Sequence, residues 1–326
     1  MRRGRAYVWT VAAVAGLVSA AQAMAPPNAT YRGQKQCISC HRTPNPAIIN
    51  KYVPSPMAQA MVDINDADED KVAAVLKADL ATAPFGKDKV AFIFGAGRDE
   101  QAYLDKGLMV LPQMWLVREK KWVDTPAVDA GQQCLGCHVT GYNPKTHASK
   151  ALGVGCEMCH GPGSAHISTL KKGETLDPGD IDDAHVRAYI CGQCHAKGLA
   201  KDGVTPFAVD YRPGGDLLAL FDLAKVNGPG RNQQLNDLMT SKHWRKGIVC
   251  DTCHDAHGDT GHPSQLKKPI IEMCLTCHAK RITDLPTHLA KVGRKPAADV
   301  TCASCHMPHG RHLFSKEAAQ ASDVGR

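Results

Sequence analysis

The sequence predicts a mainly α-helical fold with a small antiparallel β element and a large share of loop. Aromatic residues make up only 5% of the 326 residues, and the hydrophobic fraction of 43% includes 14 cysteines, which is thin for a globular core of this size. The 29 glycines and 20 prolines indicate many turns. We therefore expect that something other than side chains fills much of the interior.

Hydrophobic periodicity places the individual elements. An acidic stretch at residues 58–80 has helical character. Apolar residues then alternate as they do in strands, at Val90, Phe92 and Phe94, then at Tyr103, 108–111, 114–117 and Trp122. A loop rich in proline and glycine at 206–215 precedes a helical pair that is broken at 228–230. No long low-complexity linker separates these segments, so we expect one continuous domain over residues 24–326.

The first 23 residues have the features of a secretory signal. Three arginines stand among the first five residues, an apolar run covers residues 6–21, and Ala21-Gln22-Ala23 is a cleavage pattern of small residues. The alternative is an uncleaved anchor helix, which is disfavoured because the run is short for a membrane span. The sequence thus predicts a cleaved signal peptide at 1–23 and a periplasmic or extracellular protein.

All 14 cysteines fall into seven copies of one pattern, C-x-x-C-H, and none is left over. We number these copies motifs 1 to 7 in chain order. They are Cys37/Cys40/His41, Cys134/Cys137/His138, Cys156/Cys159/His160, Cys191/Cys194/His195, Cys250/Cys253/His254, Cys274/Cys277/His278 and Cys302/Cys305/His306.

The spacing in the motif fits covalent haem attachment. Two thiols on one helical turn can each add to one vinyl group of a haem, and the following histidine becomes the proximal iron ligand. Zinc sites need C-x-x-C units in pairs, but seven is odd, and zinc gives no reason for the histidine. A C-x-x-C disulfide would close a tiny loop and stabilise little. The sequence therefore predicts seven covalently bound haem c groups, which would form the core.

The charge of the chain is consistent with this interpretation. The formal net charge is +7 and the sequence pI is about 8.7. Ionised haem propionates add negative charge, which the basic residues can offset. The basic pI therefore does not indicate a nucleic-acid partner, and we expect none.

Seven of the 16 histidines close a motif, and the other nine are candidates for the sixth iron ligand. His257 and His309 each lie three residues after a proximal histidine, on the same helical face, so each should bind a neighbouring haem instead of its own. The surroundings of His243 and His288 are helix-like. The predicted distal ligands are His166, His243, His257, His288 and His309, with His185 next, and the predicted spares are His147, His262 and His312.

The chain resembles multihaem cytochromes of the cytochrome c-554 type over most of its expected mature length. Residues 156–166, CEMCHGPGSAH, match a CxxCHGPGSxH segment of that family. In the family the last histidine of this segment is a distal ligand, so the resemblance implies that role for His166. Similarity also covers residues 134–144, 152–155 and the stretch from 93 to 115. The C-terminal part is similar to stacked-haem periplasmic cytochromes that donate electrons to nitrite reductase or cross outer-membrane porins.

One position departs from the pattern of these relatives, which often carry a histidine ligand in an S-x-H-A-x-A stretch after the first motif. Here residues 55–60 read SPMAQA, so Met57 stands where the imidazole is expected. Three alternatives are open for the first haem: Met57 ligates its iron, another side chain does, or the iron has an open position. We propose the first.

Three functions are compatible with these features. The first is an electron-transfer protein that passes electrons along closely packed haems between redox-protein donors and acceptors. The second is a subunit of an extracellular haem filament or of a porin-inserted, membrane-associated conduit. The third is a multihaem reductase or oxidase of small nitrogen or sulfur compounds, for which the sequence gives no C-x-x-C-K site. The surplus of histidines favours the first, without a chemistry of its own.

Overall fold

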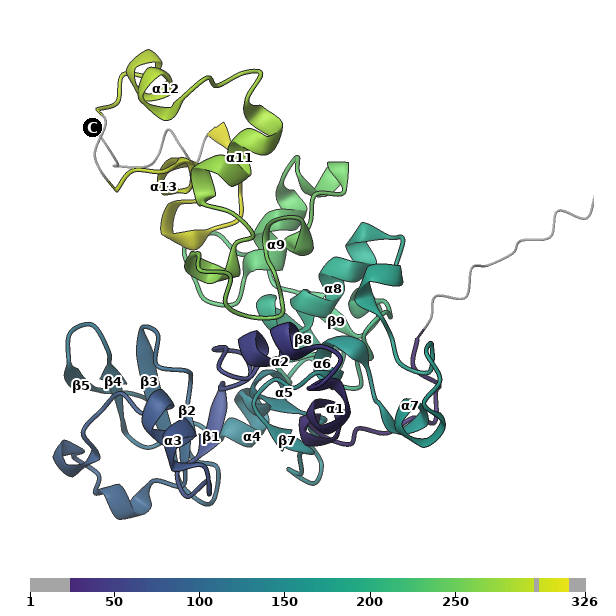
Figure 1. The fold of residues 1–326 in the computed structure, drawn as a ribbon. Coiled ribbons are helices and arrows are strands. Elements are labelled where there is room, and N and C mark those ends of the chain that lie inside the picture. Colours follow the sequence, from purple (N-terminus) through teal and green to yellow (C-terminus); the bar gives the residue numbers. More distant parts are fainter. Residues whose placement is uncertain (1–23, 296–298, 317–326) are drawn as a thin grey trace, which may run out of the picture.

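The computed structural model describes residues 24–295 and 299–316 (Figure 1). The expected signal peptide at 1–23 lies outside these residues. Within them the chain forms 13 α-helices, nearly all of them short. They are α1 (Gln34–His41), α2 (Pro46–Tyr52), α3 (Glu69–Val75), α4 (Ala130–Gln133), α5 (Leu135–His138), α6 (Glu157–His160), α7 (Ser164–Thr169), α8 (Ala184–His195), α9 (Gln234–Thr240), α10 (Cys250–Cys253), α11 (Ile270–His278), α12 (Leu285–Lys291) and α13 (Cys302–His306).

The largest sheet has five antiparallel strands in the order β1-β2-β3-β4-β5. Its centre is tightly packed, because Val62 pairs with Ile93 and Ile93 pairs with Tyr103, and all three side chains are fully buried. Two further sheets each have two strands. The strands are β1 (Met61–Asp63), β2 (Phe92–Phe94), β3 (Glu100–Leu104), β4 (Gln113–Leu116), β5 (Lys121–Asp124), β6 (Val139–Thr140), β7 (Ala151–Leu152), β8 (Gly198–Ala200) and β9 (Phe221–Leu223).

The apolar side chains gather in separate clusters. One cluster joins the five-stranded sheet to α3, and another joins α8, α9 and β9. In Figure 1 the sheet and α3 form one end of the molecule at the lower left, α11, α12 and α13 form another at the top, and α8 lies in the remaining part, near β8 and β9. This division leaves the helices that carry the motifs along the middle and the C-terminal part. The described helices include none with the length and apolar character that a membrane span requires.

The structure agrees with the predicted sheet and differs elsewhere. Strands β2 to β5 cover most of the predicted alternation, but residues 108–111 form only isolated bridges. The predicted helix at 58–80 is wrong over most of its length: only α3 at Glu69–Val75 is α-helical, and residues 61–63 form β1, whose pairing with β2 outweighs helix propensity. The helix expected before the break at 228–230 is also wrong, since β9 occupies that stretch and only α9 follows the break.

Candidate haem sites

Each motif lies on a short helix that ends at or beside its histidine. Helices α1, α5, α6, α8, α11 and α13 end at the motif histidine itself, and α10 ends at Cys253, one residue before His254. Capping side chains fix where two of these helices begin. Asp183 accepts hydrogen bonds from the first turn of α8, and Thr301 accepts one from Ser304 in α13. The two thiols and the imidazole of a motif therefore lie on one turn.

Five of the seven motif histidines face a second histidine across a fixed gap. The ring centroids are 6.0 to 6.4 Å apart in all five pairs. The pairs are His41–His166, His160–His257, His278–His243, His254–His312 and His306–His288.

This separation is what two imidazoles on opposite faces of one metal ion require. A metal–imidazole bond of about 2 Å on each side places the two ring centres roughly 6 Å apart. Direct stacking would bring the rings closer, as between Phe94 and His138, whose centroids are 4.2 Å apart. The paired residues therefore fit an axial bis-histidine site for haem iron.

Backbone carbonyls orient several of these rings. The Nδ1–H groups of His160 and His254 donate to the carbonyls of Leu176 and Ser264, at 2.9 and 2.8 Å. On the distal side, His166 Nδ1 donates to the Lys171 carbonyl at 3.0 Å. A donor at Nδ1 leaves Nε2 as the free lone pair, so each ring presents Nε2 to the partner side.

The predicted distal histidines fall into two groups. His166, His243, His257 and His288 each face a motif histidine. As expected, His257 faces the histidine of another motif, His160, and not the histidine three residues before it.

His309 was expected as a distal ligand and His312 as a spare, and the structure reverses these two roles. His312, expected as a spare, faces His254. His309 is exposed, and its φ of 58° puts it in the left-handed region, so the chain turns there and the helical face shared with His306 is lost.

His185 and Met57 are also placed differently from the expectation. His185 stacks on Trp244 at 4.0 Å, and its Nε2 donates to the Trp244 carbonyl at 2.9 Å, which occupies the nitrogen a metal would need. The imidazole opposite His41 belongs to His166, in the position that was expected for Met57. The Met57 carbonyl accepts a hydrogen bond from Val154 N at 3.0 Å, two residues before Cys156 of motif 3.

Two motif histidines, His138 and His195, face no histidine among the described residues, which include all 16 histidines of the chain. His138 stacks on Phe94 instead, and its Nδ1 contacts the Ala60 carbonyl at 3.4 Å. Burial lowers the pKa of His195, and the nearby Gln234 side chain partly offsets this. The sequence could not separate motifs 2 and 4 from the others, because it shows only that enough histidines exist.

The thiols of different motifs lie close together. Cys137 Sγ contacts the Gln193 carbonyl at 3.7 Å, and Cys194 Sγ contacts the Cys137 carbonyl at 3.9 Å. Helix α8, which carries motif 4, also packs against α5, α6 and α10, which carry motifs 2, 3 and 5. Motif 4 is therefore the centre of the arrangement.

Hydrogen bonds between thiols of other motifs shift the pKa values of those thiols and so indicate which motifs are neighbours. A hydrogen bond with Cys156 raises the pKa of Cys37 and links motifs 1 and 3. A hydrogen bond with Cys250 raises the pKa of Cys191 and links motifs 4 and 5. A hydrogen bond with Cys274 lowers the pKa of Cys302 to about 7 and links motifs 6 and 7.

Two weaker couplings complete the series. The pKa of Cys194 is raised first by its hydrogen bond with Cys137 and then, among smaller effects, by the charge of Cys159 in motif 3. Burial raises the pKa of Cys253, and the thiol of Cys277 in motif 6 adds to that effect. The motifs thus form a chain in the order 1-3-4-5-6-7, with motif 2 joined to motif 4.

Three predicted haem-binding thiols, Cys40, Cys134 and Cys305, take no part in these links. Cys40 is exposed and its Sγ accepts from the neighbouring Ser39 hydroxyl at 3.9 Å, and Cys277 of motif 6 is exposed as well. Cys305 is half-buried, and it contacts no thiol of another motif in the described part of the chain. For Cys40 and Cys305 the reason is their position, because α1 and α13 carry the first and last motifs and neither helix buries a residue. Only the first thiols of the two end motifs, Cys37 and Cys302, meet another motif.

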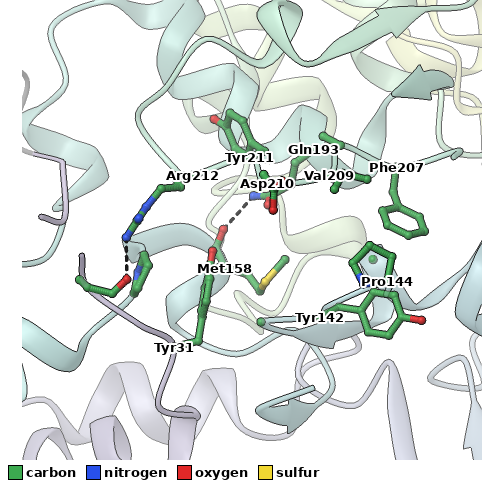
Figure 2. Close-up of a pocket in the computed structure, with 15 residues that line it drawn as sticks. Tyr31, Tyr142, Pro144, Met158, Gln193, Phe207, Val209, Asp210, Tyr211 and Arg212 are labelled. Atoms are coloured by element: carbon green, nitrogen blue, oxygen red, sulfur yellow. Dashed lines mark hydrogen bonds between the residues drawn. The ribbon is translucent and has the colours of Figure 1, made fainter. Parts of the chain in front are cut away.

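A cavity of about 240 Å³ lies beside motifs 2, 3 and 4 (Figure 2). Gly136, Met158 and Gln193 line it, one from each motif, and Gln193 donates to the Met158 carbonyl at 2.7 Å. The hydroxyl of Tyr211 and the Nε of Arg212 are buried there without a hydrogen-bond partner among the described residues. These donors suit a carboxylate, the group that a haem carries on its propionates.

Comparisons with known proteins agree with this geometry. Residues 113–161 match the family described as cytochrome c554 and c-prime, and residues 243–283 match the doubled CXXCH motif. The first match contains motifs 2 and 3, and the second contains motifs 5 and 6.

Two curated relatives are similar over about half of the chain. Dissimilatory sulfite reductase MccA of Wolinella succinogenes is 28% identical over 182 residues, which cover 48% of this chain and 22% of that protein. Multiheme cytochrome MtrA of Shewanella baltica is 25% identical over 198 residues, which cover 54% of this chain and 45% of that protein. The chain spans less than half the length of either relative.

Two solved structures share the fold. The outer cell wall cytochrome OcwA superposes with a TM-score of 0.70 at 19% identity, over 90% of this chain and 81% of that one. The undecaheme cytochrome from the S-layer of Carboxydothermus ferrireducens gives a TM-score of 0.56 at 19% identity, over 89% of this chain and 52% of that one. These likenesses show the fold, and the C-x-x-C-H motifs with the two family matches show that the chain binds haem c covalently and is a multihaem c-type cytochrome with a segment of the cytochrome c554 type.

Proposed function

We propose that this protein is a heptahaem cytochrome c that carries electrons between redox partners. Bound haem supplies a one-electron iron couple whose potential depends on axial ligands, hydrogen bonds and burial. The observation that carries the proposal is the packing of the motif helices: α8 packs against α5, α6 and α10, α11 packs against α13, and Glu157 of motif 3 accepts a hydrogen bond from Gly33 at the start of α1. No motif stands apart from the chain, so no haem would be isolated.

In this proposal each paired histidine is an axial ligand. The seven motif histidines are the proximal ligands, and His166, His243, His257, His288 and His312 are the distal ones. Pairs drawn from different segments tie the chain together, since His257 lies in the loop after motif 5 but serves motif 3, and His243 precedes motif 5 but serves motif 6. Haem insertion and folding of the chain are then coupled.

Motifs 1, 2 and 7 are the ends of the contact chain, and motif 4 is its branch point. Electrons that enter at motif 1 reach motif 7 only by way of motifs 3, 4, 5 and 6. Motif 2, which lies next to the five-stranded sheet through the contact of His138 with Phe94, forms a side arm. This arrangement provides two separate exits from a common centre.

The transfer function can be tested by reoxidation kinetics of the purified holoprotein. All haems are first reduced with dithionite, and the protein is then mixed with a soluble ferric chelate. If the motifs form one conducting chain, the haem absorption bands return to the oxidised form completely, and no fraction stays reduced. A fraction of haems that remains reduced with excess chelate present would contradict the proposal.

A second candidate function is supported by motifs 2 and 4. His138 and His195 face no histidine in the described part of the chain, so the iron at each could bind an outside ligand, which is the arrangement that a reductase or oxidase of small nitrogen or sulfur compounds needs. The four remaining histidines, His147, His185, His262 and His309, form no ring pair with His138 or His195 within the described residues: His185 stacks on Trp244, and His147 and His309 are exposed. Turnover of sulfite, nitrite or hydroxylamine by the holoprotein with a reduced or oxidised dye would establish this function.

The cellular setting is part of the proposal. Residues 1–23 have the composition of a signal peptide, and two proteins that share the fold are named for the outer cell wall and the S-layer. We therefore assign this chain to the periplasm or the cell exterior, as a single domain over residues 24–326 that contacts redox proteins. Sedimentation of the native protein distinguishes a monomer from a haem filament or a larger conduit.

A further inference from the structure

Glu157, the residue after Cys156 in motif 3, is the most deeply buried carboxylate beside the haem sites after Asp237. Only 2% of its surface is exposed, and its two oxygens accept hydrogen bonds from three backbone N–H groups. The donors are Arg32 N at 2.9 and 3.0 Å, Gly33 N at 2.7 Å and Gly163 N at 2.8 Å. No basic side chain forms an ion pair with Glu157 in the described part of the chain, so backbone groups alone compensate its charge.

The three donors stand at the starts of two helices. Gly33 is the N-cap residue of α1, which ends at His41, and Gly163 is the N-cap residue of α7, which contains His166. His41 and His166 are the facing pair with centroids 6.2 Å apart. One carboxylate therefore joins the two segments that supply both imidazoles of motif 1.

We propose that Glu157 is a positioning residue that holds His41 and His166 on opposite sides of the first haem, an inference that rests on the ligand pairing assigned above. It acts through the backbone and not through the iron. Because Glu157 belongs to motif 3, it also couples the geometry of the first haem to the attachment turn of the neighbouring one.

The chemistry of the contact requires a carboxylate. Both oxygens of a carboxylate accept hydrogen bonds, whereas the amide of glutamine has one acceptor and one N–H₂ donor. In Glu157→Gln, the N–H₂ half of the side-chain amide must face a backbone N–H donor. At least one helix start therefore loses its acceptor. Aspartate keeps both acceptors but is shorter by one methylene group, so it reaches only part of the donors.

A second contact allows the variants to fold. Thr30 N donates to Ser164 Oγ at 2.8 Å, and Ser164 N donates to the Thr30 carbonyl at 3.2 Å. These bonds join the same two segments without Glu157. Loss of the carboxylate therefore loosens the spacing of His41 and His166, while the segments stay together.

The test uses electron paramagnetic resonance of the full-length oxidised holoprotein, in which high-spin haems are counted. Glu157→Gln should keep the haem content of the wild type and show up to one additional high-spin haem. Glu157→Asp should show a smaller fraction of the same signal. Ser164→Ala, the matched control, removes a hydrogen bond between the same segments and should leave the count unchanged.

The reference variant is His166→Ala, which removes the ligand itself and should add one full high-spin haem. If His166→Ala adds that signal while Glu157→Gln and Glu157→Asp remain as the wild type, the positioning role is overturned. If Ser164→Ala raises the signal as much as Glu157→Gln does, general loosening explains the effect and the role is again overturned. If His166→Ala itself adds no high-spin haem, the ligand pairing fails, and the inference fails with it for that separate reason.

Discussion

Asp237 forms a buried ion pair with Arg311, with Arg311 Nη2 2.6 Å from Asp237 Oδ1 and Nε 3.2 Å from Oδ2. The Asp237 side chain is 1% exposed, and its hydrogen bond raises the pKa of Arg311. Asp237 Oδ2 also accepts from the backbone N of His312 at 3.2 Å. A residue of α9 thus holds the C-terminal segment where the His312 ring faces His254.

We expect Asp237→Asn to lower the free energy of unfolding by about 3 kcal/mol, because it leaves a largely buried guanidinium without its charge partner. It should also weaken ligation by His312, which would appear as a new high-spin fraction in the oxidised protein. Thermal unfolding followed by circular dichroism gives the first value. Asp70→Asn is the control, since Asp70 is exposed on α3, and its effect should stay within about 0.5 kcal/mol.

His312→Ala should convert one haem from low spin to high spin, because it removes the only imidazole that faces His254 among the described residues. His309→Ala should leave the spectrum unchanged, since His309 is exposed and lies three residues away on a turn. Visible and electron paramagnetic resonance spectra of the two variants decide between the assignments. The opposite result would restore His309 as the ligand.

Gly153→Ala should be strongly destabilising, because its φ is 75° and a Cβ atom there would lie 2.0 Å from the Ala58 carbonyl oxygen. Gly203 has nearly the same φ, 73°, but nothing within 4 Å of the added atom. Gly203→Ala should therefore lower the free energy of unfolding only by the backbone strain of a positive φ, about 1 kcal/mol. The cost of Gly153→Ala should be about 3 kcal/mol, measured by the same unfolding experiment. Equal losses would contradict the close approach.

Much of the site could be predicted because the haem motif is local in sequence. The motif fixes both thiols and the proximal histidine on one helical turn, so no tertiary information is needed to find them. It could also be predicted from the sequence that His257 faces the histidine of another motif, since two imidazoles three residues apart cannot bind one iron from opposite sides. The alternating apolar residues likewise indicated β2 and its neighbours.

The distal side depends on long-range contacts that no local pattern reveals. The choice between His309 and His312 depends on the turn at residues 308–310 and on the ion pair from Asp237, which is 74 residues away from Arg311. The expectation for Met57 assumed that the segment after motif 1 stays with motif 1. In the structure His166 of α7 faces His41, and the segment also reaches motif 2, where the Ala60 carbonyl contacts His138.

The number of open iron positions gives the sharpest prediction about chemistry. The pairing leaves His138 and His195 without a facing imidazole among the described residues, so the reduced holoprotein should bind two equivalents of carbon monoxide, one at each of these haems. His166→Ala should bind a third, because it opens one of the five paired sites. Absorption changes on titration with carbon monoxide count the equivalents. Saturation at zero would mean that side chains other than histidine close both positions, and it would remove the basis for a reductase or oxidase function. Two equivalents would instead place both reactive irons at the centre of the contact chain, at motif 4 and its side arm, where electrons from either end can reach them.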